Sequence, residues 1–155
     1  MQAHWTNPSV IEWCQYLLDS YADWIKLELM DRSGTPLTQA KRLFNSAFIV
    51  ASHGTEADPI LNYGNQAALN LWAMDWQQFI RTPSRFTAES PSREERARML
   101  QQAKIQGYIS NYSGIRISSA GERFLVDQAI IWNIHKPDGT AIGQGATFSN
   151  WKYLD

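Results

Sequence analysis

The sequence predicts one α+β domain with a five-stranded antiparallel sheet, short helices on one face of the sheet, and an N-terminal capping helix. Two strand-like segments precede a block of short helical segments and three follow it, an order that differs from a βαβ repeat. Turn sequences at 118–121 and 136–139 separate the last three strands. The N-terminal residues carry the apolar spacing of an amphipathic helix.

The N-terminal helix is predicted from Pro8 to about Leu29, because Asn7 can cap it and proline suits the first helical position. Steps of three and four residues place five apolar side chains in one stripe: Val10, Cys14, Leu17, Tyr21 and Trp24. A stripe of this width needs cover, either from the outer face of the chain's own sheet or from a second copy. The second alternative would make the chain a homodimer through this helix. We treat residues 1–37 as an N-terminal helical extension and 38–155 as the core of one domain.

The first half of the core is predicted to contain two strands and three short helical segments. They are a helical turn at 38–43, strands at 44–52 and 60–63, and helices at 67–72 and 76–80. Asn65 and Asp75 precede the last two helices, where their side chains can accept hydrogen bonds from free backbone N–H groups. We therefore interpret Asn65 as a helix cap rather than a ligand contact.

The second half begins with a helix from about Arg93 to Gln106, opened by a capping box of Ser92 and Glu95. Three strands follow, at 108–117, 122–135 and 140–148. Strict alternation along the strand at 122–135 places residues 124, 126, 130, 132 and 134 on one face of the sheet. Residues 125, 129 and 131 lie on the other face. Both faces are apolar, so the central helices should cover one and the N-terminal helix the other.

Charge and composition exclude several classes of protein. The 155 residues carry a formal net charge of −1, whereas a protein that binds nucleic acid through its phosphates needs a basic surface. Met1–Pro8 has no basic and apolar signal pattern, and no run reaches the roughly 18 apolar residues of a membrane span. A single cysteine, Cys14, suits a reducing compartment. We expect a cytoplasmic protein that contacts neither nucleic acid nor membrane.

Two stretches of sequence resemble PAS domains. Residues 60–72 are similar to the second strand and first helix of that fold, in which an I-x-x-x-N-x-A-A-x-x-L run is common, and Asn65 matches its asparagine. Ser119-Ala120-Gly121 and Pro137-Asp138-Gly139 resemble the hairpins of its last three strands. The blocks 61–65, 83–89, 93–98 and 112–119 look like the PAS-related MEKHLA family, over nearly the whole chain. This resemblance implies a sensory or interaction fold without a settled ligand.

Known PAS chemistries make demands that the residues do not meet. A cysteinyl–flavin adduct needs a cysteine within 74–107, and an axial haem ligand needs a histidine in 93–106, and neither is present. The three histidines (His4, His53 and His135) are scattered, so no metal-ligand spacing emerges. Glu94 and Glu95 are adjacent and cannot face each other on a helix. We therefore predict no enzyme activity, no cofactor and no metal.

Polar and aromatic residues inside apolar blocks are the candidate ligand site. Arg85 and Arg116 could bind a carboxylate or phosphate, and Tyr112 and Arg116 are expected to share one strand face with Tyr108. The other candidates are Tyr63, Trp72, Trp132 and Asn133. The alternative is that both arginines pair with structural carboxylates such as Glu89, Glu94 or Asp127.

Two functions remain open from the sequence. The first is a sensor that binds a small, anionic or partly aromatic molecule and signals through an unidentified partner protein. The second is a protein–protein interaction or dimerisation module with a filled core and no ligand.

Overall fold

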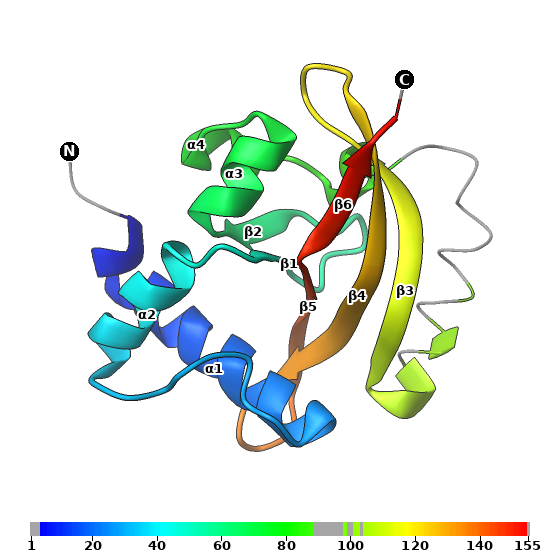
Figure 1. Ribbon diagram of the computed structural model, residues 1–155. Coiled ribbons are helices and arrows are strands. Elements are labelled where there is room, and N and C mark those ends of the chain that lie inside the picture. Colours follow the sequence, from blue (N-terminus) through cyan, green and yellow to red (C-terminus); the bar gives the residue numbers. More distant parts are fainter. Residues whose placement is uncertain (1–3, 89–97, 99–100, 103, 155) are drawn as a thin grey trace.

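One six-stranded antiparallel sheet organises the chain (Figure 1). The computed structural model describes residues 4–88, 98, 101–102 and 104–154. The elements before the middle of the chain are η1 (His4–Thr6), α1 (Pro8–Ile25), α2 (Pro36–Phe44), β1 (Ile49–His53), β2 (Leu61–Gly64), α3 (Gln66–Trp72), α4 (Trp76–Phe79) and η2 (Ser84–Thr87). The strands β3 (Tyr108–Ile117), β4 (Arg123–His135), β5 (Ala141–Phe148) and β6 (Asn150–Tyr153) follow.

The strand order β2-β1-β5-β4-β3 confirms the predicted α+β fold with its five-stranded antiparallel arrangement. The sixth strand, β6, was not predicted. It pairs with the first half of β4, from Phe124↔Tyr153 to Asp127↔Asn150, and so continues the line of β5 along the same edge (Figure 1). A segment of four residues beside a chain end gives too short a pattern to be recognised as a strand.

Two predicted boundaries were wrong. The N-terminal helix ends at Ile25 instead of about Leu29, because Lys26 adopts a left-handed conformation with φ 67° and closes the helix. The first strand begins at Ile49 instead of Phe44, because Phe44 is the last residue of α2. The predicted helix at 93–106 and its Ser92–Glu95 capping box lie largely outside the described residues; of that range, 98, 101–102 and 104–106 are helical.

The outer face of the sheet is covered by α1, as the first of the two alternatives predicted. Three indole nitrogens fasten the helix to the strands: Trp13 Nε1 donates to Ser52 Oγ (2.9 Å), Trp24 Nε1 to Asn133 O (2.9 Å), and Trp132 Nε1 to Leu17 O (3.2 Å). Cys14, Leu17, Leu18 and Tyr21 are buried in this interface. The apolar stripe of α1 is therefore covered by the chain's own sheet.

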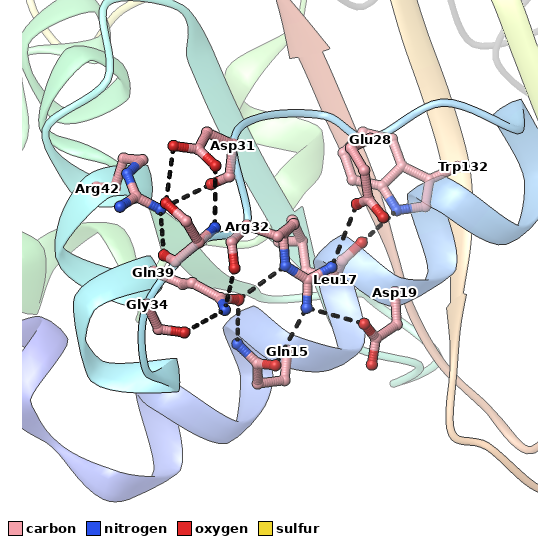
Figure 2. A network of polar contacts seen from close by, with 11 residues as sticks. Gln15, Leu17, Asp19, Glu28, Asp31, Arg32, Gly34, Gln39, Arg42 and Trp132 are labelled. Carbon is pink, nitrogen blue, oxygen red and sulfur yellow. Dashed lines mark hydrogen bonds and ion pairs between the residues drawn. The ribbon is translucent and has the colours of Figure 1, made fainter.

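A polar network holds α2 against α1 (Figure 2). Arg32, in the loop between the helices, donates to Gln39 Oε1 (2.7 Å), Gln15 Oε1 (3.1 Å) and Asp19 Oδ1 (3.0 Å). Gln39 returns the contact, because its Nε2 donates to Arg32 O at 2.7 Å and to Gly34 O at 3.1 Å. Arg32 and Gln39 thus fix the loop between the two helices through side chains that the sequence analysis had not singled out.

Two β-bulges overturn the strict alternation predicted for the long strands. Between Val126 and Ala129, β4 advances three residues while β3 advances two, and Gln128 lies at φ 56°. A compensating bulge in β3 lies at Asn111, with φ 58°. Each bulge exchanges the two faces of its strand.

The consequence is a new assignment of faces. Ala129 and Ile131 share the helix-block side with Phe124 and Val126, whereas Ile130, Trp132 and Ile134 turn toward α1. Tyr108 pairs with Trp132 and so lies on the opposite face from Tyr112 and Arg116, contrary to the prediction.

Candidate functional site

A short strap, residues 83–88, crosses the inner face of the sheet. At one end Pro83 forms a bridge with Ile60, next to β2, and Ser84 N donates to Pro59 O (2.8 Å). At the other end Ala88 forms a bridge with Arg116 of β3. Because β2 and β3 are the two edges of the five-strand order, the strap joins one edge to the other over the inner face.

A cavity of about 110 Å³ lies between this strap, the helices α3 and α4, and the sheet. Its floor is aliphatic and comes from three strands: Ala51, Val126, Ala129, Ile131 and Ala146. Its roof includes Trp72 of α3, Phe79 of α4 and Thr87 of the strap. The bulge at Gln128 is what directs Ala129 and Ile131 into this space rather than toward α1.

Three of the seven candidate residues line the cavity: Trp72, Tyr112 and Arg116. Trp72 is buried among aromatic rings and packs edge-on against Phe124 and Phe148, with ring centroids 5.7 and 6.1 Å away. Its indole Nε1 is buried and has no hydrogen-bond partner among the described residues.

Arg116 and Tyr112 form the polar end of the cavity. The Arg116 guanidinium lies 5.4 Å from the centre of the Tyr112 ring, and Nη1 donates to Ile115 O at 3.3 Å. Gly114 lies between them, and a Cβ at that position would come within 2.1 Å of the Tyr112 hydroxyl oxygen. The absence of a side chain at 114 therefore lets the Tyr112 ring extend along the strand toward Arg116.

The carboxylates proposed as structural partners of Arg116 divide into two groups. Asp127 accepts a hydrogen bond from Ser113 Oγ at 2.7 Å instead, and Glu89 and Glu94 lie outside the described residues. Among the residues that the structure describes, no carboxylate is paired with Arg116. No other hydrogen bond joins its guanidinium to a described residue.

Arg85 lies on the exposed surface of the strap and outside the cavity lining. Its Nε is 3.2 Å from Asp58 Oδ1, and both side chains are 54% exposed. The Phe86 ring lies 4.2 Å from its guanidinium carbon. The structural pairing considered for Arg85 is therefore present, but with Asp58 as the partner rather than Glu89, Glu94 or Asp127.

The other three candidates lie away from the cavity lining. Tyr63 and Trp132 are on the sheet face beneath α1, where Tyr63 pairs with Ser52 and lies beside Cys14. Burial raises the pKa of the Cys14 thiol to about 12, so the thiol stays protonated. Asn133 is adjacent to the lining, because its Oδ1 accepts from the lining residue Gln144 at 3.3 Å.

Several lining residues were missed by sequence reasoning. His53 and Gln144 form a second polar end opposite Arg116, and they are paired in register between β1 and β5. Ser84 and Thr87 line the strap side, with Thr87 Oγ1 donating to Ser84 O at 2.6 Å. The pairing of β1 with β5 joins segments about 90 residues apart, so no local pattern could have revealed it.

Two features are absent from the described residues. No helix in this part of the chain is both long and apolar enough to cross a membrane. No group of three or more His, Cys, Asp and Glu side chains among these residues is placed to hold a metal ion.

Comparison with known proteins places this geometry in context. The family model of the MEKHLA domain matches residues 11–153. No curated protein matches the chain. Among solved structures, the PAS domain of a protein from Colwellia psychrerythraea superposes with a TM-score of 0.64 at 11% identity, covering 76% of this chain and 94% of that one.

Two further solved structures show the same fold. A PAS domain from a two-component sensor histidine kinase has a TM-score of 0.55 at 10% identity, over 74% of this chain and 91% of its own. A light-oxygen-voltage domain studied with a flavin analogue has a TM-score of 0.58 at 12% identity, over 76% of this chain and 85% of its own. The fold is thus that of PAS domains.

Proposed function

The chain belongs to the MEKHLA domain family, and from this premise we propose that it is a sensory domain that binds a small anionic molecule and signals through a partner protein. The observation that carries the proposal is the cavity on the inner face of the sheet, with Arg116 as the one permanently charged side chain among its described lining residues. An apolar pocket with a few convergent polar groups is the usual form of a small-molecule site.

The size of the cavity limits the ligand. At about 110 Å³ it is close in volume to an engineered apolar cavity of roughly 150 Å³ that binds benzene. A flavin ring system or a haem is several times larger than benzene. We therefore propose a colourless ligand, and a chemistry of binding rather than of catalysis.

The test is native mass spectrometry of the purified protein, followed by a thermal-shift screen of metabolites. We expect a bound mass, or an anionic ligand whose stabilisation disappears in Arg116→Ala while that variant remains folded at the assay temperature. Arg85→Ala is the matched control, because it removes an arginine that lies outside the cavity lining. If no ligand stabilises the protein and Arg116→Ala is only less stable, the interaction module with a filled core is the better function.

The route of the signal is also a proposal. A homodimer would have to use a surface other than the apolar stripe of α1, because that stripe packs on the chain's own sheet. We place the partner in the cytoplasm, where a single buried free thiol such as Cys14 stays reduced. Light scattering during size-exclusion chromatography, with and without ligand, would measure the oligomeric state.

A further inference from the structure

We infer that the ligand is a short aliphatic monocarboxylate of about four to eight carbons, a size set by the benzene-like cavity volume. Its carboxylate would lie at Arg116 and Tyr112, and its chain would lie over the aliphatic floor. This inference rests on the proposed ligand-binding function and specifies the chemical class of the ligand.

The charged end of the cavity fits one carboxylate. Among the described residues, the Arg116 guanidinium donates one hydrogen bond, to Ile115 O, and its other donors could bind a planar acceptor. The Tyr112 hydroxyl lies above Gly114, on the Arg116 side of its own backbone. A phosphate would require more donors, and the nearby Thr87 hydroxyl already donates to Ser84 O.

The opposite end selects against a second charge. Gln144 and His53 are the polar side chains there, and the described lining contains neither another arginine or lysine nor any carboxylate. A dicarboxylate would bury its second charge where the described lining has no arginine or lysine, and an ammonium group would find no carboxylate there. Both arrangements carry a large desolvation cost.

The shape of the floor favours a chain over a ring. Val126, Ala129 and Ile131 line the cavity from β4, so the floor follows this strand for roughly 15 Å. The side chains along it are alanine, valine and isoleucine. Trp72 of the roof and Phe148 of β5 both line the cavity, but their rings pack edge-on against each other, with centroids 6.1 Å apart.

The experiment measures affinity by calorimetry for butanoate, hexanoate and octanoate. Three matched probes isolate each feature of the inference: hexanamide removes the charge, adipate adds a second carboxylate, and benzoate replaces the chain with a ring. We expect hexanoate or octanoate to bind at least tenfold more tightly than each of these three probes. Each probe loses one desolvated charge contact or the fit of the chain to the floor.

Four variants locate the site. Arg116→Gln should weaken the binding of hexanoate at least tenfold, and Arg116→Lys should weaken it by a smaller factor. Arg85→Gln should change the affinity for hexanoate by less than twofold. Ala129→Leu fills the floor and should weaken octanoate more than butanoate. Circular dichroism melting of each variant without ligand establishes that it is folded at the assay temperature.

The outcomes separate the ligand class from the function. Suppose that benzoate or hexanamide binds as tightly as hexanoate and that Ala129→Leu abolishes this binding. The ligand class is then wrong and the binding function stands. If no probe and no screened metabolite binds, and Ala129→Leu leaves the protein as stable or more stable, both proposals fail. Loss of hexanoate binding in the folded Arg85→Gln variant would also overturn the assigned position of the carboxylate.

Discussion

Asn65 connects four parts of the fold through one buried amide. Its Oδ1 accepts from Ala68 N (3.1 Å), which caps α3 as predicted, and from Val50 N (3.2 Å) in β1. Its Nδ2 donates to Phe48 O (2.8 Å), Ser46 Oγ (3.0 Å) and Leu43 O (3.3 Å). The helix cap could be predicted from the local sequence, but the contacts of Asn65 with α2 and β1 depend on tertiary packing.

Replacing Asn65 with alanine should lower the free energy of unfolding by about 3 kcal/mol or more. Several buried backbone groups would lose their partner at once, and each costs about 1–3 kcal/mol when left unsatisfied. Urea denaturation followed by circular dichroism would measure the loss. Asn70→Ala is the matched control, because Asn70 is exposed and, among the described residues, its side chain accepts a hydrogen bond from Gln66 Nε2 on the same helix. A loss below about 1 kcal/mol for Asn65→Ala would contradict this account.

His4 makes the stability of the N-terminal segment depend on pH. Its ring stacks on Trp76 with centroids 4.7 Å apart, and burial lowers the pKa of His4 below its usual value of 6.5, against the smaller opposing effect of Asp75. The unfolded chain therefore binds a proton at higher pH than the folded chain does. Stability contributed by this histidine is complete above about pH 6.5 and declines as the pH falls below it.

The measurement is the unfolding free energy of the wild type and of His4→Phe between about pH 5 and pH 7.5, the range in which histidine titrates. Phenylalanine keeps a ring on Trp76 without a proton to bind. The variant should lose less stability on acidification than the wild type. Equal pH slopes for the two proteins would show that His4 does not titrate differently on folding.

At the scale of the element, the positions of the long strands were predicted well, but the faces of their residues were not. The two bulges explain the error in the faces. The strands β3, β4 and β5 were located to within one residue, because their turn sequences and β-forming residues are local signals. The single extra residue at Gln128 leaves no such signal, since glutamine is rare at positive φ. The side of the sheet on which Ala129 and Trp132 lie therefore follows from the bulge and not from alternation.

Deleting Gln128 should destabilise the protein severely, whereas Gln128→Gly should be neutral or stabilising. The deletion restores strict alternation and turns the rest of β4 over, so that Trp132 would face the cavity and Ile131 would face α1. Glycine keeps the bulge and tolerates its φ of 56° without strain. Thermal melting of both variants tests this expectation. A deletion variant as stable as the wild type would show that the bulge does not set the register.

At the scale of the whole molecule, the site was harder to predict than the fold. Arg116, Tyr112 and Trp72, which line the cavity, were chosen as candidates because polar or large aromatic side chains in apolar segments are visible in the sequence. Arg85 has the same local character, but it lies on the outer surface of the strap beside Asp58. Which arginine faces the cavity depends on how the strap crosses from β2 to β3, and that is a property of the assembled sheet.

The N-terminal extension should be inseparable from the core, although the sequence suggested a boundary near residue 37. Removing residues 1–35 would uncover Trp132 and Ile134, which are fully buried, and would eliminate Arg32 from the network that holds α2 (Figure 2). The deletion also removes the buried side chains of Leu17, Leu18 and Tyr21. Loss of one large buried side chain typically costs about 2–5 kcal/mol, and the total stability of a domain is about 5–15 kcal/mol.

We therefore expect the truncated protein to aggregate, or to remain soluble only as a loosened state that binds a hydrophobic dye. Size-exclusion chromatography and dye fluorescence would distinguish these states. Deletion of residues 1–6 is the matched control, because it keeps the Asn7 cap of α1 and the whole apolar stripe. A stable, monomeric, dye-silent product of the longer deletion would show that α1 is an accessory to the sheet. The cavity could then be studied in the core alone.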